Sequence, residues 1–424
     1  MAAPAAVIGV VGAGTMGAGI AQLAARSGAR TLLHDPLPEA LERGARYARE
    51  GLGKEAAKGR LSSEEADVAV ARIEPVDDLA AFADCELVIE AAPERLPLKH
   101  ELYARLSAEI VGPECVLATN TSSLLVTAIA AAASRPERVV GMHFFNPAPI
   151  MRLLEIVAGE QSDERSLALA RATGEAMGKA VIRAVDGPGF LVNRCNRPFG
   201  LEALRLLQER IADIETIDRI MRIEGGFRMG PFELSDLVGV DTGFEISKSF
   251  FEQSFGEPRW RPSPIQAKRV AAGLHGRKTG RGYYDYSSDP YRPPDPDPDP
   301  DPPTRADAKV RPAVGGVLER IVCQVINECA FALGEGVGSA EDIDTGMVLG
   351  LNYPRGPLAW ADEIGLDHVL AVLDGLWEEY REERYRPAPA LRGLVRAGRL
   401  GRASGSGFFS YDSAPPESPQ QTRL

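Results

Sequence analysis

A histidine, a glutamate and a serine in one stretch of this chain have the chemistry needed to oxidise an alcohol. His143 is followed twelve residues later by Glu155, and Ser122 lies 21 residues before His143 in a serine-rich turn. Histidine is the side chain whose ordinary pKa lies near neutrality, so it can accept the hydroxyl proton of a substrate. A carboxylate can hold the imidazole in one tautomer, and a serine hydroxyl can hydrogen-bond the reacting oxygen. These three residues are therefore candidates for the catalytic set of a dehydrogenase.

A glycine-rich loop near the N-terminus predicts where a dinucleotide binds. The run Gly12-Ala13-Gly14-Thr15-Met16-Gly17 follows an apolar strand at residues 6–11 and opens a helix at residues 16–27. Such glycines permit a tight turn and a close approach of the pyrophosphate. The free N–H groups at the helix N-terminus bind phosphates, so Thr15 and Met16 are counted with the glycines as candidate cofactor contacts.

An aspartate downstream of this loop predicts the type of cofactor. Asp35 follows Gly12 by 23 residues, and its carboxylate can accept hydrogen bonds from both ribose hydroxyls. The same carboxylate would repel a 2′-phosphate, which favours NAD over NADP. The alternative is a glycine-rich turn in a domain that binds no dinucleotide.

Alternating strands and helices must position these residues. Short apolar strands are predicted at residues 6–11, 31–34, 87–89, 116–118 and 139–142. Strands that alternate with helices indicate a parallel sheet covered on both faces. A helical hairpin is predicted at residues 37–72, and residues 190–209 are predicted to form one long helix in which Pro198 can introduce a kink.

The helical part of the chain contains two copies of one unit. Ile217-Asp218 recurs as Ile343-Asp344, and Gly230-Pro231 recurs as Gly356-Pro357, in both cases 126 residues later. A Pro/Asp-rich segment separates the copies and is predicted to be an extended spacer. The fold class is therefore predicted to be an α/β N-terminal domain with a Rossmann-type parallel sheet, followed by two all-α repeat domains.

The expected domain boundaries follow from these patterns. We expect an NAD-binding domain at residues 1–186, a first helical C-terminal domain at residues 187–286, a linker at residues 287–309 and a second helical repeat at residues 310–424.

Composition narrows the class of partner and the compartment. A net charge of −12 argues against nucleic acid or an anionic membrane as the main partner. The five cysteines are scattered and form no C-x-x-C pair, so we expect reduced thiols, no metal site and a cytoplasmic protein. Residues 1–25 carry no charged side chain, but they contain five glycines and lack the basic start of a signal peptide, so we expect neither export nor a membrane span.

Four further strings of the chain are informative together. They are Asn120-Thr121-Ser122-Ser123-Leu124, His143-Phe144-Phe145-Asn146-Pro147, Gly187-Pro188-Gly189-Phe190-Leu191-Val192-Asn193-Arg194 and Met229-Gly230-Pro231-Phe232-Glu233-Leu234. With the glycine-rich loop, they make the chain resemble the L-3-hydroxyacyl-CoA dehydrogenase family. The resemblance extends from about residue 8 to residue 184 and across both helical repeats, which is nearly the whole chain.

The resemblance implies a role for each residue of the site. His143 is the general base that takes the proton of the 3-hydroxyl group, Glu155 orients it, and Ser122 hydrogen-bonds the substrate oxygen. Asn193 lies beside the substrate at the domain junction, and Asn146 supports the same constellation. The implied reaction is the reversible, NAD-dependent oxidation of an L-3-hydroxyacyl-CoA to a 3-ketoacyl-CoA, in fatty-acid β-oxidation or a related route of acyl-CoA degradation.

The resemblance also implies further contacts with the cofactor and the substrate. Glu94 and Lys99 are expected near the nicotinamide half of NAD, and Asn120 is expected to contact the cofactor as well. The helical hairpin is similar to the arm that reaches CoA in this family, with Lys54 and Lys58 as candidate phosphate contacts. The alternative is that these two lysines are ordinary surface charges.

The second repeat departs from the family pattern. It has Glu319 at the position that corresponds to Asn193 and carries no nucleotide domain of its own, so we expect it to be catalytically silent. In single-repeat relatives the helical domain is a dimerisation surface, which a second copy in the same chain can replace. We therefore expect residues 310–424 to pack on residues 187–286 as an internal pseudo-dimer.

Two other functions are compatible with the sequence. A sugar-acid 3-dehydrogenase, as in crystallin-like relatives, would keep the chemistry but would need no arm for CoA, so the basic residues of the hairpin disfavour it. A protein that binds NAD and has lost catalysis is disfavoured by the intact set of Ser122, His143, Glu155 and Asn193. For the leading function, butyryl, longer and dicarboxylic acyl groups all stay open.

Overall fold

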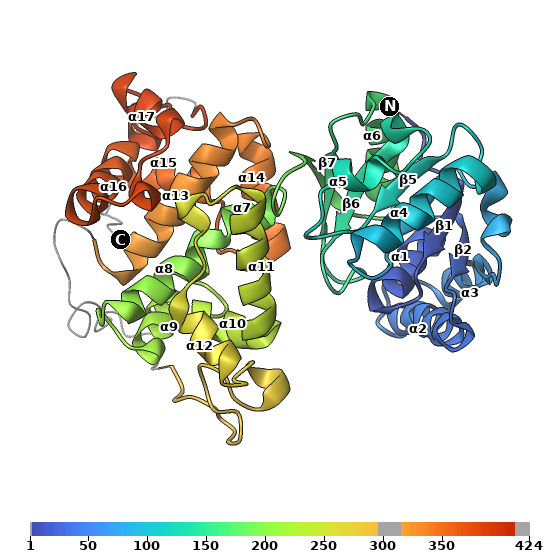
Figure 1. Ribbon diagram of the computed structural model, residues 1–424, viewed down its shortest axis with the longest axis horizontal. Coiled ribbons are helices and arrows are strands. Elements are labelled where there is room, and N and C mark those ends of the chain that lie inside the picture. The colour runs from blue at the N-terminus through green and yellow to red at the C-terminus, as the bar shows by residue number, and fades with distance from the viewer. Residues whose placement is uncertain (1, 296–314, 412–424) are drawn as a thin grey trace. The chain divides into compact units, whose positions relative to one another are not determined.

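The chain divides into two compact units. The computed structural model describes residues 2–295 and 315–411 (Figure 1). Unit 1 is Met1–Phe190 and unit 2 is Leu191–Leu424. Most of the predicted Pro/Asp-rich linker, residues 296–309, lies outside the described residues. No helix within the described ranges is both long and apolar enough to cross a bilayer.

Unit 1 is built on an eight-stranded sheet with the order β3-β2-β1-β4-β5-β6-β7-β8. The strands are β1 (Val7–Val11), β2 (Arg30–His34), β3 (Ile73–Pro75), β4 (Leu87–Glu90), β5 (Val116–Thr119), β6 (Val139–Phe144), β7 (Leu153–Ala158) and β8 (Ala180–Val185). All neighbouring strands run parallel except β6 and β7, which pair antiparallel. The Rossmann-type parallel sheet is thus confirmed, with one reversal and three strands that the sequence did not predict.

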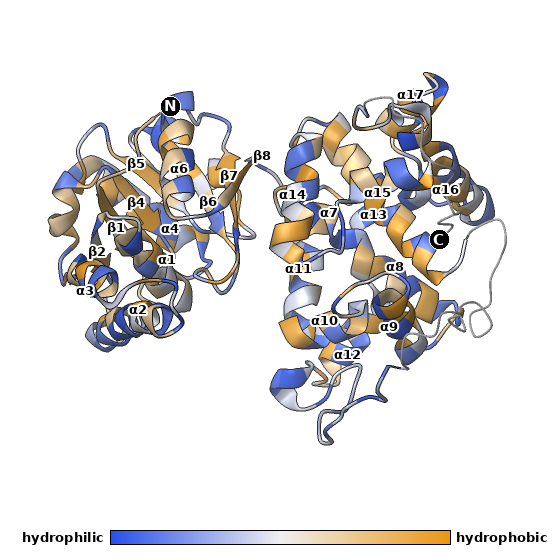
Figure 2. Cartoon of the chain, turned by 180° about the vertical axis from the view of Figure 1, so that it is seen from behind, coloured by the Kyte–Doolittle hydropathy of each residue, from blue (hydrophilic) through white to orange (hydrophobic). Residues whose placement is uncertain are grey.

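Helices cover the sheet of unit 1. They are α1 (Thr15–Arg26), α2 (Pro38–Ala57), α3 (Ser63–Ala71), α4 (Leu96–Arg105), α5 (Val126–Ala130) and α6 (Glu164–Ala176). The predicted hairpin at residues 37–72 corresponds to α2 and α3, which pack on each other. Strands of a sheet that is covered on both faces are expected to be mostly hydrophobic. Figure 2 shows hydrophobic residues along the strands of unit 1, as expected for such a sheet.

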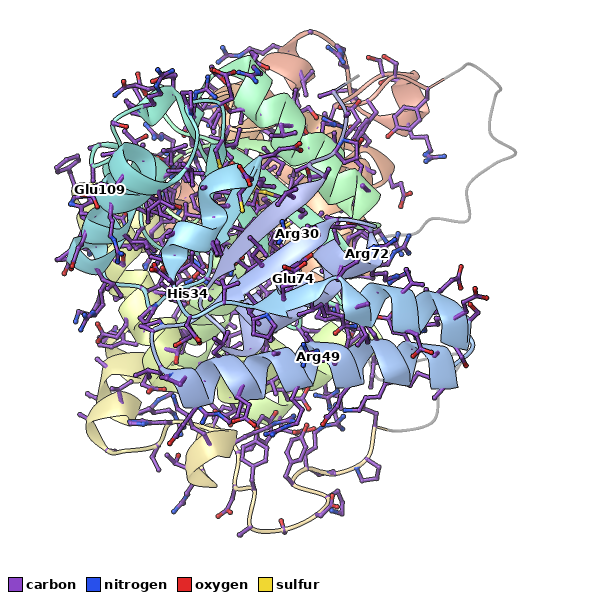
Figure 3. All side chains as sticks on the ribbon, turned by 90° about the vertical axis from the view of Figure 1, so that its right-hand side faces the viewer. Arg30, His34, Arg49, Arg72, Glu74 and Glu109 are labelled. Carbon is purple, nitrogen blue, oxygen red and sulfur yellow. The ribbon has the colours of Figure 1, made fainter. Side chains whose placement is uncertain are left out.

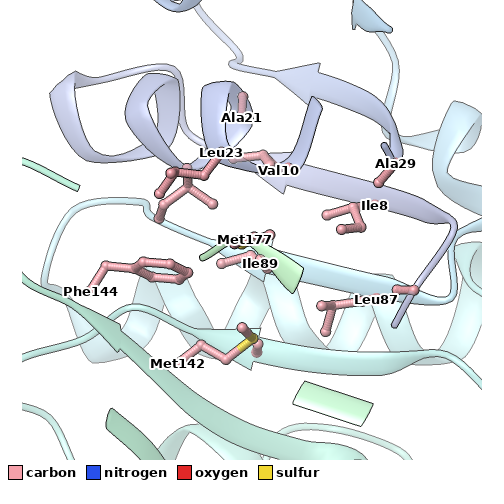
Figure 4. Close-up of a cluster of buried hydrophobic side chains, with 14 of the residues drawn as sticks. Ile8, Val10, Ala21, Leu23, Ala29, Leu87, Ile89, Met142, Phe144 and Met177 are labelled. Carbon is pink, nitrogen blue, oxygen red and sulfur yellow. The ribbon is translucent and has the colours of Figure 1, made fainter. Parts of the chain in front are cut away.

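The core of unit 1 joins α1 and α6 to one face of the sheet. Figure 4 shows Val10, Ile89 and Met142 from three strands packed in one cluster with Leu23 of α1. At the far edge, Arg30 of β2 forms two hydrogen bonds of 2.9 and 2.8 Å with Glu74 of β3 (Figure 3). The short β3 therefore has a charge-assisted attachment as well as its backbone pairing.

The described elements of unit 2 are helices with short turns. Those before the linker are α7 (Val192–Cys195), α8 (Arg197–Gln208), α9 (Ile214–Ile223), α10 (Pro231–Val238), α11 (Val240–Gln253) and α12 (Pro264–Ala271). Those after it are α13 (Val317–Gly334), α14 (Ala340–Leu351), α15 (Pro357–Ile364), α16 (Leu366–Tyr380) and α17 (Pro389–Arg396).

The prediction of one long helix at residues 190–209 is wrong, because the structure has two helices there, α7 and α8. Pro198 lies in the first turn of α8, where its missing N–H leaves no helical hydrogen bond unmade. The corresponding position in the second copy is Gln324, which has an N–H, and there α13 is continuous over 18 residues.

The two copies share the same hydrogen bonds between a buried aspartate and the backbone. The carboxylate of Asp218 accepts from the N–H groups of Phe232 and Glu233, both at 2.9 Å. Asp344, which corresponds to Asp218, accepts from the N–H groups of residues 358 and 359 at 2.8 and 2.9 Å. Each aspartate thus satisfies the free amides that begin a helix, α10 in one copy and α15 in the other.

Buried ion pairs join the two copies reciprocally. Arg194 binds Glu328 and Glu335, with Nε 2.9 Å from the Glu328 carboxylate. Arg320 is the counterpart of Arg194, 126 residues later. It binds Glu202 and Glu209, with its Nη1 atom 2.8 Å from the Glu209 carboxylate. The same spacing of 126 residues relates Glu202 to Glu328 and Glu209 to Glu335. Both arginines and two of the four carboxylates are almost fully shielded from solvent.

We expect Arg320→Met to destabilise unit 2 by about 3 kcal/mol or more, because it leaves the fully buried Glu202 without one of its charge partners. Urea unfolding of the full chain, followed by circular dichroism, measures the loss. Lys248→Met removes an exposed ion pair with Glu245 in the same unit and should cost less than about 0.5 kcal/mol. Equal losses in the two variants would contradict a structural role for the buried pair.

Candidate active site

The strand reversal in unit 1 brings His143 and Glu155 face to face. They lie directly opposite each other in the antiparallel register of β6 and β7. The Nδ1 atom of His143 is 2.6 Å from Oε2 of Glu155, and Glu155 is fully buried while His143 is 6% exposed. A buried carboxylate requires a hydrogen-bond partner, and the imidazole supplies one. This contact assigns the Nδ1 proton to the carboxylate side, so Nε2 is the ring nitrogen that can exchange a proton with a substrate.

Two aromatic rings enclose the imidazole. The ring centroid of His143 is 4.7 Å from that of Phe145 and 5.7 Å from that of Phe190. These apolar neighbours lower the local dielectric constant, which strengthens the interaction between the imidazole and Glu155. Asn146 differs from His143 in its environment. His143 is buried within β6, whereas Asn146 is exposed in the turn after that strand.

The loop that carries Ser122 is held at the carboxyl end of β5 by Glu94. Its Oε1 atom accepts from the hydroxyl of Thr121 at 2.6 Å and from the N–H of Ser122 at 2.8 Å. Burial favours a higher pKa for Glu94, but the Thr121 hydroxyl, the Lys99 charge and the Ser122 amide outweigh burial and lower that pKa. Glu94 is thus a charged anchor of the loop, and the side chain of Ser122 is exposed.

Lys99 is the buried partner of this carboxylate. It is 1% exposed, and its Nζ lies 2.6 Å from Glu90 and 3.2 Å from Glu94. Sequence analysis missed Glu90, which ends β4 and also accepts from the hydroxyl of Thr119 at 2.8 Å. The signal was a charged residue directly after the apolar run Leu87-Val88-Ile89. Glu94 and Lys99 therefore lie together, as an ion pair at the carboxyl ends of the strands.

Asn120 links three neighbouring strands at this edge. Its N–H donates to the carbonyl of Glu90 at 2.8 Å, and its side-chain oxygen accepts from the N–H of Phe144 at 2.8 Å. Because Phe144 follows His143, this bond holds the end of β6 against the loop after β5. Hydrogen bonds therefore join the carboxyl ends of β4, β5 and β6 into one platform, which includes His143 at the end of β6 and is continuous with the loop that carries Ser122.

The glycine-rich loop is fixed by Asp35. The Asp35 carboxylate accepts from the N–H of Ala13 at 2.8 Å and from the N–H of Leu37 at 3.0 Å. A Cβ atom on Gly17 would lie 1.7 Å from the carbonyl oxygen of Gly12, whereas a Cβ atom on Gly14 would meet nothing within 4 Å. Gly17 is required for the loop itself, and Gly14 leaves open space at the N-terminus of α1.

A pocket of about 260 Å³ lies between this loop and α2. Arg43 and Tyr47 of α2 line it together with Gly14 and Thr15, and both were missed by the sequence analysis. Met16 lies in the first turn of α1 and packs against the main core cluster. The sequence contained a signal for a basic residue near the cofactor loop. The predicted hairpin begins two residues after Asp35, and Arg43 is the first arginine in it.

The structure places the remaining predicted residues apart from this platform or in the other unit. Lys54 and Lys58 are exposed at the C-terminal end of α2. Asn193 belongs to unit 2, where it lies in α7 and its carbonyl accepts from Nε of Arg197 at 3.2 Å. Glu319, the counterpart of Asn193, pairs instead with His368 at 3.0 Å.

Comparison with known proteins identifies the family to which this chain is similar. The family model for the NAD-binding domain of 3-hydroxyacyl-CoA dehydrogenase matches residues 7–187, and the model for the C-terminal domain of 3-hydroxyacyl-CoA dehydrogenase matches residues 189–286 and again residues 315–411. A 3-hydroxyadipyl-CoA dehydrogenase from Escherichia coli is 37% identical, over 91% of this chain and 96% of its own length. A probable 3-hydroxybutyryl-CoA dehydrogenase from Deinococcus radiodurans is 42% identical, over 66% of this chain and 99% of its own.

A solved structure extends the similarity to the fold of the whole chain. The crystal structure of a 3-hydroxybutyryl-CoA dehydrogenase from Escherichia coli K12 superposes with a TM-score of 0.86 and 35% identity, covering 94% of this chain and all of that chain. The glycine loop with its aspartate, the paired His143 and Glu155, and the two matches to the C-terminal domain together show that the chain belongs to the 3-hydroxyacyl-CoA dehydrogenase family.

Proposed function

We propose that the protein catalyses the reversible, NAD-dependent oxidation of an L-3-hydroxyacyl-CoA to a 3-ketoacyl-CoA, in fatty-acid β-oxidation or a related route of acyl-CoA degradation. The observation that carries the proposal is the 2.6 Å contact between His143 and the buried Glu155. A histidine held by a buried carboxylate, on the platform that presents Ser122, has the parts needed to remove a hydroxyl proton from a secondary alcohol.

In this mechanism Nε2 of His143 takes the proton of the 3-hydroxyl group. The negative charge of Glu155 stabilises the imidazolium that forms, and the Nδ1 contact keeps Nε2 directed to the substrate side. The hydroxyl of Ser122 donates a hydrogen bond to the substrate oxygen as that oxygen becomes a carbonyl. Bound NAD supplies the acceptor for the hydride that leaves C3. In the reverse direction His143 returns its proton to the same oxygen.

The glycine loop fits the pyrophosphate of a dinucleotide. The open space at Gly14 lies at the N-terminus of α1, where backbone N–H groups have no helical partners and attract phosphate. Asp35 uses one lone pair of each oxygen for the backbone and retains others for ribose hydroxyls. Its negative charge beside the ribose position favours NAD over NADP. Glu94, Lys99 and Asn120 would then shape the nicotinamide end from the strand platform.

The proposed substrate contacts are of two kinds, hydrogen bonds from asparagine side chains and attraction by lysine charges. Asn193 is proposed to hydrogen-bond the substrate near the reacting carbon, and Asn146 to support the turn after His143. Lys54 and Lys58 are proposed to attract the phosphates of CoA from the end of α2, where their exposure leaves them available. The Escherichia coli and Deinococcus radiodurans relatives are named for a six-carbon diacid and a four-carbon acid, so both kinds of acyl group are candidates for this chain.

We also propose that the helical part of the chain contains two all-α repeat domains, residues 187–286 and 310–424, that form an internal pseudo-dimer. The reciprocal binding of Arg194 to Glu328 and of Arg320 to Glu202 supports this, because a two-fold interface pairs residue with counterpart in both directions. The second repeat is proposed to be catalytically silent, since Glu319 replaces Asn193. All five cysteines are buried free thiols, which supports a reducing compartment such as the cytoplasm.

We expect His143→Gln to lower kcat by about 100- to 10,000-fold, because an amide cannot accept the hydroxyl proton. The assay follows NADH absorbance with acetoacetyl-CoA and is repeated with NADPH, which should react far more slowly. His368→Gln, in the second repeat, should leave kcat unchanged. Turnover of His143→Gln equal to that of the wild type would exclude the mechanism, and activity restricted to a CoA-free 3-keto acid would favour a sugar-acid dehydrogenase.

We expect Gly14→Ala to weaken NADH binding by roughly tenfold while leaving thermal stability unchanged, because the new methyl group meets no protein atom and lies where the phosphates approach. Gly17→Ala should destabilise unit 1, since its Cβ would overlap the carbonyl of Gly12. Fluorescence titration with NADH and thermal unfolding separate the two effects. Gly53→Ala, at an exposed position near the C-terminal end of α2, is the control and should not change NADH affinity. Unaltered affinity in Gly14→Ala would remove the loop from the cofactor site.

A further inference from the structure

Glu90 is a buried carboxylate of unit 1 that the proposed mechanism does not use. It ends β4 at the carboxyl edge of the sheet and is 1% exposed. Its Oε1 atom accepts from the N–H of Ala92 and from Nζ of Lys99, both at 2.6 Å, and its Oε2 atom accepts from the hydroxyl of Thr119 at 2.8 Å. A carboxylate that accepts three hydrogen bonds, one of them from an ammonium group, is stabilised as an anion.

Lys99 is shared between this carboxylate and a second one. Its Nζ atom lies 2.6 Å from Glu90 and 3.2 Å from Glu94. Burial opposes the charge of Glu94, but the Thr121 hydroxyl, the charge of Lys99 and a backbone amide outweigh burial and lower its pKa. Glu90, Lys99 and Glu94, the Glu–Lys–Glu triad, therefore combine two negative charges with one positive charge, which gives a net charge of −1.

A buried tyrosine beside the Glu–Lys–Glu triad adds no charge to it. Tyr103 is 0% exposed. Burial and the charge of Glu90 raise the pKa of Tyr103 well above its usual value, so the hydroxyl keeps its proton.

The strand order predicts which half of the cofactor lies near the triad. In an open α/β sheet a dinucleotide lies across the carboxyl ends of the strands where the strand order reverses, and here β1 and β4 flank that point. Asp35 after β2 is the proposed ribose contact, so the nicotinamide half is expected over β4 and β5, which end at Glu90 and Thr119. The loop after β4 also adjoins the glycine loop, since a Cβ atom on Gly12 would lie 2.7 Å from the carbonyl oxygen of Ala91.

The two redox states of the cofactor differ in charge at the nicotinamide ring, which is a cation in NAD+ and neutral in NADH. In the proposed oxidation a hydride leaves C3 of the substrate for the ring, and the hydroxyl proton goes to Nε2 of His143. One positive charge is therefore lost at the ring and one is gained by the imidazole, where Glu155 stabilises it. A fixed negative charge on the ring side favours the oxidised cofactor.

We propose that Glu90 sets the redox balance of the bound cofactor, because its charge keeps the Glu–Lys–Glu triad at a net charge of −1, which stabilises NAD+ relative to NADH. This inference rests on the proposed function. Without the charge of Glu90, Lys99 would neutralise Glu94, and the nicotinamide ring would face a neutral group of side chains. Glu90 is thus a positioning residue that acts through Lys99.

The test compares the dissociation constants of NAD+ and NADH, measured by calorimetric titration of the full chain. Glu90→Gln keeps the size of the side chain and removes one negative charge. We expect the ratio of the NAD+ constant to the NADH constant to rise roughly tenfold, as Coulomb's law gives for charges about 10 Å apart at an effective dielectric constant of about 20. For a two-electron couple, a tenfold change in this ratio raises the potential of the bound cofactor by about 30 mV.

Glu86→Gln is the matched control. Glu86 is exposed and precedes the same strand at its opposite end, so its replacement should leave the ratio of the two constants unchanged. Equal changes of both constants in Glu90→Gln would mean a structural role only and would overturn the proposal.

A charge-matched double variant separates charge from structure. Lys99→Met in the Glu90→Gln background also removes the positive charge, so Glu94 alone restores the original net charge. The ratio of the two constants should then return to within about threefold of the wild-type value. A ratio that stays raised in the double variant would contradict the inference, because a structural defect is not corrected by a second substitution among the same contacts. If Glu90→Gln does not fold, Glu94→Gln removes the same charge and decides by the same ratio.

The outcomes also separate this inference from the proposed function. If the wild type binds both forms of the cofactor and oxidises 3-hydroxybutyryl-CoA, but Glu90→Gln keeps the wild-type ratio, the dehydrogenase activity stands and the role of Glu90 is refuted. If the wild type binds neither NAD+ nor NADH, the proposed function fails and the inference fails with it.

Discussion

The antiparallel pairing of β6 with β7 is the constraint on which the proposed chemistry depends. In a sheet whose other neighbours run parallel, this one reversal places His143 opposite Glu155 across two hydrogen-bonded strands. The carboxylate is fully buried, and removing an ion from water is expensive unless a partner satisfies it. The imidazole is that partner, so the stability of the sheet and the orientation of the base follow from the same contact. A site built on paired strands is also more rigid than one built on a loop.

A second buried charge cluster, formed by Glu90, Lys99 and Glu94, fixes the loops next to His143 and Glu155. Glu90 ends β4 and holds Lys99, Lys99 also binds Glu94, and Glu94 binds the backbone of Ser122. Asn120 then joins the loop after β5 to the end of β6. Because each contact satisfies a group that would otherwise be buried or free, the carboxyl edge of the sheet has one preferred arrangement. This edge is where ligands bind in open α/β sheets.

Unit 2 uses buried charge in a different way. The reciprocal pairs formed by Arg194 and Arg320 satisfy four glutamates between the copies, and α13 packs on α8. Arg197 differs from these arginines: within the described ranges its guanidinium contacts the carbonyl of Asn193 and the ring of Phe250 and pairs with no carboxylate.

The sequence by itself determined the features that local spacing encodes. The glycine run before Asp35, five of the eight strands of unit 1 with its first helix and helical hairpin, and the 126-residue repeat could be predicted, because each depends on neighbours in the chain or on a second copy of the same pattern. Tertiary structure decided the strand reversal that pairs His143 with Glu155, the role of Glu90 beneath Lys99, the break between α7 and α8, and the absence of a carboxylate beside Arg197 within the described residues. These features depend on contacts between segments far apart in the chain. Charge and periodicity do not specify such contacts, because the partner of a buried group is chosen by packing.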